Sequence, residues 1–103
     1  MWAQLMKMRT RPEKLQDLPS MFDELQAAEQ PGSGLVRSVA MQDQQDPNQI
    51  YVLVMFESEE QARAREQDPR RKALLESVQA QMSEVFEGPP EFVDLTVIRD
   101  VAQ

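Results

Sequence analysis

The chain of 103 residues is 41% apolar and 28% charged, which is ordinary for a globular protein, and its length fits one domain over residues 1–103. Its net charge of −7 argues against nucleic acid or an anionic membrane surface as a partner. It contains neither cysteine nor histidine, which excludes disulfide bonds, a thiolate nucleophile, an imidazole base and a typical zinc site.

The sequence gives no sign of a targeting or membrane segment. No stretch approaches the roughly 20 apolar residues of a membrane-spanning helix. The first ten residues also lack the apolar core of a signal peptide. We therefore expect a cytoplasmic protein.

The chain begins with a predicted strand followed by a helix. Trp2–Arg9 is the strand, and a helix is predicted over Pro12–Gln30. The helix carries an apolar stripe made of Leu15, Leu18, Phe22 and Leu25. Pro19 interrupts this stripe, so it either kinks the helix or marks its true start, with Asp17 as the cap. We favour the kink, because Leu15 keeps the helical period.

Two strands joined by a polar turn follow the helix. The Pro-Gly-Ser-Gly sequence at 31–34 ends the helix. A hairpin is predicted from strands at Leu35–Gln42 and Gln49–Glu57. Within it, Ile50–Phe56 is a run of seven apolar residues, which is typical of a strand buried on both faces. Because the helices of a small domain usually cover one face of its sheet, we expect a second subunit or a ligand to cover the other.

Two further helices and a last strand complete the predicted order. Ser58 and Gln61 form a capping box for the first helix, and Asp68-Pro69 ends it and starts the next. The apolar face of that next helix is Leu75, Val78, Met82 and Val85. Gly88-Pro89-Pro90 stops it, and a strand is predicted over Phe92–Val101. The order β-α-β-β-α-α-β predicts an α+β, ferredoxin-like subunit with its helices on one face of a four-stranded antiparallel sheet.

One part of the chain resembles a known family. Tyr51–Ala62 is a strand that runs into the sequence Phe-Glu-Ser-Glu-Glu-Gln-Ala, and Asp68-Pro69 then opens a third helix. This arrangement resembles the antibiotic-biosynthesis monooxygenase-like family. The resemblance implies a homodimer, in which two sheets pack face to face as a dimeric α+β barrel.

The residues that carry chemistry in that family have no matching positions here. Its haem-degrading members use an Asn on the first strand, a Trp on the second helix and a His on the third helix. This chain has no His, its only Asn is Asn48 in the hairpin turn, and its only Trp is Trp2 on the first strand. Other members oxidise polyaromatic phenols without a cofactor, using Asn, Trp, Tyr and Arg side chains. We therefore expect no haem, metal or other cofactor, and we transfer no catalytic residue.

Four residues are candidates for lining a ligand pocket, namely Trp2, Gln4, Arg37 and Tyr51. In this hypothesis Arg37 and Tyr51 orient an aromatic or acidic metabolite while Trp2 packs on it. Each residue also has a structural interpretation. Trp2 and the Met residues of its strand could fill the dimer core, Arg37 could pair with Asp94 across the barrel, and Tyr51 could satisfy a buried carbonyl.

A basic cluster on the predicted helices suggests a phosphate site, and it comprises Arg63, Arg65, Arg70, Arg71 and Lys72. Acidic residues alternate with these cations, which favours a solvated, charged helix surface instead. No glycine-rich phosphate loop accompanies them. The sequence therefore favours a small-molecule-binding protein that resembles cofactor-independent monooxygenases. The alternatives are a non-catalytic protein that binds a hydrophobic metabolite and a structural dimerisation protein.

Overall fold

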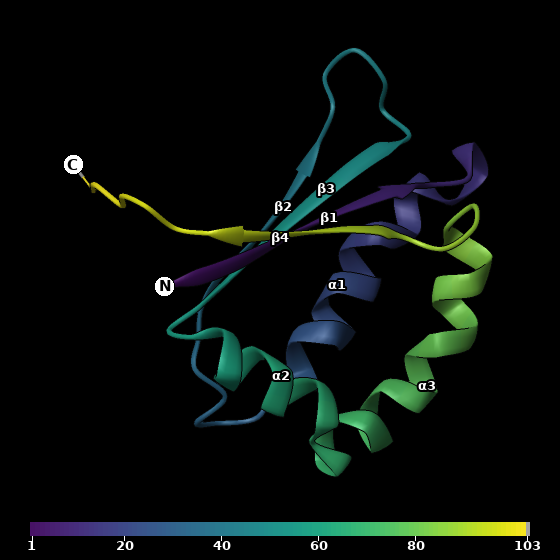
Figure 1. Cartoon of the computed structure of the whole chain (residues 1–103). Helices are drawn as coiled ribbons and strands as arrows, with labels where there is room; N and C mark the ends of the chain where they lie inside the picture. Colours follow the sequence, from purple (N-terminus) through teal and green to yellow (C-terminus); the bar gives the residue numbers. More distant parts are fainter. Residues whose placement is uncertain (103) are drawn as a thin grey trace.

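The computed structural model describes residues 1–102 as four strands, three α-helices and a 3-10 helix. In chain order they are β1 (Trp2–Arg9), η1 (Pro12–Asp17), α1 (Leu18–Ala27), β2 (Leu35–Gln42), β3 (Gln49–Phe56), α2 (Glu59–Gln67), α3 (Pro69–Val85) and β4 (Glu91–Thr96). The strands form one antiparallel sheet in the order β2-β3-β1-β4. All the helices lie on one of its faces (Figure 1). This confirms the α+β, ferredoxin-like fold predicted from the order of the elements.

Alternation along the central strand β3 gives the sheet two unlike faces. The residues that face the helices are buried, and they are Ile50, Val52, Val54 and Phe56. The residues between them face the other way and are partly exposed, namely Tyr51, Leu53 and Met55. The helices therefore cover one face of this apolar strand, and within one subunit the second face stays partly open to solvent.

The core lies between the sheet and the helices α1 and α3. Met21 of α1 and Val78 and Val85 of α3 are buried in one cluster with Phe56 of β3. Burying each such side chain stabilises the fold by about 1.5–3 kcal/mol. The positions of Val78 and Val85 confirm the predicted apolar face of α3.

The helix predicted over Pro12–Gln30 is two pieces in the structure. The α-helix begins at Leu18, so Pro19 lies in its first turn and not at a kink. Proline has no N–H to donate to the carbonyl of Leu15, and its ring would clash with that carbonyl in a continuous α-helix. The predicted kink was therefore wrong. The alternative start is the observed one, although the side chain of the N-cap residue Asp17 makes no capping hydrogen bond.

The last strand is shorter than the predicted Phe92–Val101. It ends at Thr96, which pairs with Trp2, the first residue of β1. One further hydrogen bond runs from the Val97 N–H to the Met1 carbonyl at 3.2 Å. Because β1 begins at Trp2, the ladder has no partner strand beyond this point, and the chain extends away from the body of the subunit (Figure 1).

The starts of α2 and α3 are capped as predicted, with one difference. The Ser58 hydroxyl accepts a hydrogen bond from the Gln61 backbone N–H at 3.2 Å. The Gln61 side chain accepts from that same hydroxyl at 3.0 Å and not from the Ser58 backbone N–H. The capping box is therefore half formed. Asp68 accepts from the Arg70 N–H at 2.9 Å, and Pro69 occupies the first turn of α3.

Candidate functional site

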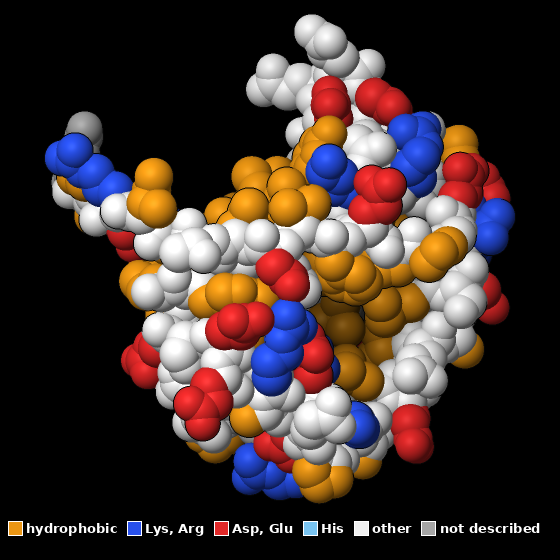
Figure 2. All heavy atoms as spheres, in the orientation of Figure 1, with side chains coloured by type: hydrophobic (Ala, Val, Ile, Leu, Met, Phe, Trp, Pro, Cys, Tyr) orange, Lys and Arg blue, Asp and Glu red, His pale blue; other side chains and the backbone are white. Residues whose placement is uncertain are grey.

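The helix face of the sheet is incompletely covered near β4. Helix α3 packs mainly against α1, η1 and α2, and Phe92, which lies on the helix face of β4, is 56% exposed. Figure 2 shows the surface hollowed between β4 and α3, with hydrophobic side chains along the walls. We call this space the helix-side hollow. On its strand side, Met6 and Phe92 are paired on the helix face of β1 and β4, and on its helix side, Leu75 and Met82 are partly buried residues of α3.

A polar cluster lies beside the hollow, where α2 approaches β1 and β4. Gln4 and Asp94 are opposite each other in the strand register, and Gln4 Nε2 donates to Asp94 Oδ1 at 2.9 Å. Arg63 of α2 donates to the second carboxylate oxygen, Nη2 to Oδ2 at 2.9 Å. The Arg63 guanidinium also lies 5.1 Å from the centroid of the Trp2 ring. We name these four residues the mouth cluster.

The mouth cluster keeps fixed charges at neutral pH. Hydrogen bonds from Gln4 and Arg63 hold the pKa of Asp94 below its ordinary value. The hydrogen bond to Asp94 in turn raises the pKa of Arg63 above its ordinary value, with further contributions from Glu59 and Glu66. Asp94 therefore stays ionised and Arg63 stays protonated near pH 7. The cluster can donate hydrogen bonds, and neither charged residue is suited to proton transfer there.

A second arginine of α2 ties this helix to the chain just after α1. Arg65 pairs with Glu29, Nη2 to Oε2 at 2.7 Å, and both side chains are largely buried. The Ser33 hydroxyl also donates to Glu29 at 2.7 Å. The Arg65 guanidinium lies 5.3 Å from the centroid of the Phe56 ring, which is 6.2 Å from that of Trp2. The two arginines of α2 therefore cover two aromatic rings of the sheet.

The structure divides the four predicted pocket residues between the two faces of the sheet. Trp2 and Gln4 lie on the helix face, as part of the mouth cluster. Arg37 and Tyr51 lie on the opposite face, on β2 and β3. Within one subunit, Arg37 and Tyr51 therefore cannot orient a ligand that packs on Trp2. A ligand-binding role for each of the four residues stays a prediction.

The surroundings of Trp2 and Arg37 also differ from those of their predicted structural roles. Trp2 and Met6 do not fill a sheet-to-sheet interface, because both lie on the helix face. Asp94 lies on that face too, where it is bonded to Gln4 and Arg63. Arg37 is exposed on the other face and forms no ion pair within residues 1–102.

The face turned away from the helices carries apolar side chains on every strand. We call it the open face, and by the strand register it includes Leu5, Val39, Leu53, Met55, Val93 and Leu95. These residues come from all four strands, so the apolar surface is continuous across the sheet. A surface of this kind is typical of a contact with another molecule.

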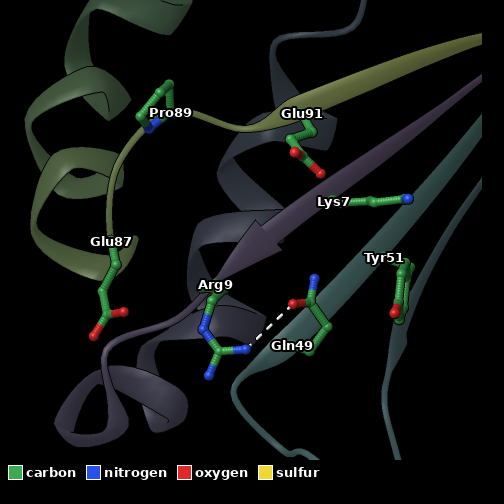
Figure 3. A pocket seen from close by; sticks show the side chains of 7 residues that line it. All are labelled: Lys7, Arg9, Gln49, Tyr51, Glu87, Pro89 and Glu91. Carbon is green, nitrogen blue, oxygen red and sulfur yellow. Dashed lines mark hydrogen bonds between the residues drawn. The ribbon is translucent and has the colours of Figure 1, made fainter.

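A polar groove of about 350 Å³ lies at one end of the open face. Figure 3 shows its lining, which is Lys7, Arg9, Gln49, Tyr51, Glu87, Pro89 and Glu91. Arg9 donates to Gln49 at 3.3 Å and pairs with Asp46 at 2.8 Å, so it already has partners. The positive charges of Lys7 and Arg9 balance the negative charges of Glu87 and Glu91 in this groove. The groove offers an aromatic ligand little apolar surface.

The described part of the chain contains neither a metal site nor a membrane helix. Within residues 1–102, no group of three or more His, Cys, Asp or Glu side chains is placed to hold a metal ion. Over the same residues, every helix is too short or too polar to cross a membrane.

Sequence reasoning did not assign Phe92, Arg63 or Asp94 to a ligand site, and it named Asp94 only as a candidate partner of Arg37. Asp94 meets Gln4 across 90 positions of sequence, which only the register of β1 and β4 reveals. Arg63 was grouped with the other cations of the helix surface. The alternation of Phe92 and Asp94 with Val93 does place the first two on one face of a strand, and it is the signal that could have found them.

Comparison with known proteins places the chain in a family. The sequence profile of the family described as antibiotic biosynthesis monooxygenase matches residues 1–77. The chain belongs to this family. The resemblance drawn from Tyr51–Ala62 is thus confirmed. No curated protein matches the chain in sequence.

Solved structures of other antibiotic biosynthesis monooxygenase proteins share the fold at low sequence identity. A candidate monooxygenase from Chloroflexus aurantiacus is 18% identical, with a TM-score of 0.71 over 98% of this chain and 96% of that one. A candidate from Bordetella bronchiseptica is 12% identical, with a TM-score of 0.75 over 95% and 97%. SnoaB from Streptomyces nogalater, a cofactor-independent oxygenase solved as a variant, is 13% identical, with a TM-score of 0.74 over 99% and 97%. At these identities the likeness establishes the fold.

Proposed function

We propose that the protein binds a flat, mainly apolar small molecule in the helix-side hollow, as cofactor-independent monooxygenases of its family would. The observation that carries this proposal is Phe92, an aromatic side chain that folding leaves more than half exposed beside a polar cluster. Apolar walls with a few polar groups are the usual composition of a small-molecule site. Membership of the family supports the same class of function.

The mouth cluster suits a ligand with a polar edge. The Gln4 amide and the Arg63 guanidinium can donate hydrogen bonds to a phenolic or carboxylate oxygen. Met6 and Met82 offer polarizable sulfur atoms to an aromatic ring. The proposed ligand is therefore an aromatic or acidic metabolite. Trp2 and Gln4 belong to its site, and Arg37 and Tyr51 do not.

Oxidation is the second part of the proposal, and the mouth cluster supplies no proton-transfer catalyst for it near pH 7. A cofactor-free oxidation would take its electrons from an electron-rich substrate, such as a polycyclic phenol. The alternative is a non-catalytic protein that binds a metabolite. The fixed charges of Asp94 and Arg63 favour that alternative, because an acid–base catalyst titrates near its working pH.

We also propose that the protein is a cytoplasmic homodimer. Monomers rarely leave a large continuous apolar surface in water, and packing two open faces together would cover both. The net charge of −7 makes nucleic acid and anionic membranes unsuitable partners. The partners in this proposal are thus a second copy of the chain and a small metabolite.

Thermal unfolding with a panel of polycyclic phenols and aromatic acids tests the binding proposal. A ligand of the folded state raises Tm in proportion to its affinity and concentration. Phe92→Ala is expected to weaken binding roughly three- to tenfold, because an aromatic contact is lost. Tyr51→Phe on the open face is the matched control, and it should bind like the wild type.

Two results would count against this site. A panel without any shift in Tm would contradict ligand binding in the hollow. The reverse pattern, with Tyr51→Phe weakened and Phe92→Ala unchanged, would move the site to the groove of Figure 3.

A further inference from the structure

One charged residue lies on the inward stripe of α3. This stripe has the i, i+4, i+7 spacing of one helix face, and it is Arg71, Leu75, Val78, Met82 and Val85. Val78 and Val85 are buried, and Arg71 is half-buried. Its neighbours Arg70 and Lys72 are exposed, as a solvated helix surface requires. The solvated helix surface expected for the basic cluster therefore does not describe Arg71.

The Arg71 side chain has no polar partner among residues 1–102. Its Nε atom is buried and makes no hydrogen bond, and none of the ion pairs in that range includes it. Glu29 and Glu66 are close enough to act on its charge. Glu29 is already paired with Arg65 at 2.7 Å, and Glu66 lies 3.5 Å from Arg63.

The charges at this corner of the molecule favour an anion. Burial, together with the charge of Arg65, lowers the pKa of Arg71 from its ordinary value. Two guanidinium groups thus face one largely buried carboxylate, that of Glu29. Arg71 is also in the first turn of α3, where the helix dipole adds positive potential. The N-cap carboxylate of Asp68, which accepts from the Arg70 N–H, offsets part of this potential. A partly desolvated charge without a partner is costly, and an incoming anion would offset that cost.

We infer that Arg71 binds the carboxylate of the ligand in the helix-side hollow, so the ligand is an aromatic carboxylic acid. The inference rests on the proposed function of the hollow. Leu75 and Met82 follow Arg71 on the same partly buried stripe of α3, so a ring held against that stripe has Arg71 at one end. Arg63 is less suited to this role, because Asp94, Glu59 and Glu66 all lie within 3.5 Å of it.

A matched pair of probes tests the inference, anthracene-2-carboxylate and its uncharged carboxamide. In calorimetric titrations the wild type should bind the carboxylate about tenfold more tightly, because charge-assisted hydrogen bonds are stronger than neutral ones. Arg71→Met should abolish this preference. Lys72→Met removes the same charge from the next, exposed position, and it should keep the preference.

The outcomes separate this inference from the proposed function. Equal affinity of the wild type for both probes, or a preference that survives in Arg71→Met, would overturn the role of Arg71 and leave ligand binding in the hollow standing. Binding of neither probe would overturn both.

A second readout needs no variant, in case Arg71→Met does not fold. The NMR resonance of the Arg71 Nε–H in the wild type should shift when the carboxylate is added and stay in place with the carboxamide. An unshifted resonance at saturating carboxylate would overturn the inference.

Discussion

Replacing Leu53 with glutamate is expected to dissociate the proposed homodimer into monomers. Leu53 lies in the middle of the open face, with Leu5 and Val39 opposite it on the neighbouring strands. A carboxylate enclosed between two apolar sheets would weaken association roughly a hundredfold or more. Size-exclusion chromatography with light scattering should give about twice the subunit mass of 11.9 kDa for the wild type, and a single subunit mass for the variant.

The matched control for this experiment is Leu74→Glu. Leu74 is an exposed leucine on α3, on the other side of the sheet, so this variant should remain dimeric. A wild type that is monomeric at micromolar concentration would contradict the packing of two open faces. A dimer that tolerates Leu53→Glu would place the interface elsewhere.

The second large effect is expected at the ion pair between Arg65 and Glu29. Their side chains are only 17% and 19% exposed. Arg65→Met leaves the Glu29 carboxylate without its main partner, which should lower the free energy of unfolding by about 2–3 kcal/mol, somewhat less than for a fully buried pair. Urea denaturation at one fixed protein concentration measures the loss. Arg9→Met breaks an exposed pair with Asp46 and should leave stability close to that of the wild type.

The same ion pair determines part of the pH dependence of stability. Burial acts to raise the pKa of Glu29, but hydrogen bonds from Arg65 and Ser33 and the charge of Arg65 outweigh it, so the pKa lies below its ordinary value of 4.5. A carboxylate with a lowered pKa in the folded state stabilises the protein above its unfolded pKa, and this contribution is lost as pH falls through the folded value. The difference in stability between the wild type and Arg65→Met should therefore shrink as the pH falls below 4.5. A constant difference from neutral to acidic pH would contradict this assignment.

The strands could be predicted because local signals bound them. The observed β1 and β2 have the predicted limits, Trp2–Arg9 and Leu35–Gln42, since turn residues or a proline follow each apolar run. The kink expected at Pro19 was wrong because a kinked helix and a later helix start fit the same apolar pattern, and the backbone constraint of proline favours the later start. The end of β4 at Thr96 depends on its pairing with Trp2, the first residue of β1, and the sequence of β4 alone does not contain that pairing.

The candidate site could be predicted only in part. The alternation along β1 correctly put Trp2 and Gln4 on one strand face. The side taken by Arg37 depends on a β-bulge between Leu35 and Arg37, which inserts Val36 and turns the rest of β2 over. One extra residue reverses every following side chain, because the period of a strand is two. The sequence does not reveal this bulge, so it does not show that Arg37 lies on the face opposite to Trp2 and Gln4.

The methionines provide the most direct test of the central claim, that the ligand site is the helix-side hollow. Met6 lies on the helix face of β1 and Met82 on the partly buried stripe of α3, whereas Met41 and Met55 lie on the open face. In NMR spectra of protein labelled at its methionine methyl groups, with each signal assigned by a single Met→Leu substitution, a bound polycyclic phenol or aromatic acid should shift Met6 and Met82. The signals of Met41 and Met55 should stay in place. Shifts at Met41 and Met55, with none at Met6 and Met82, would contradict the account.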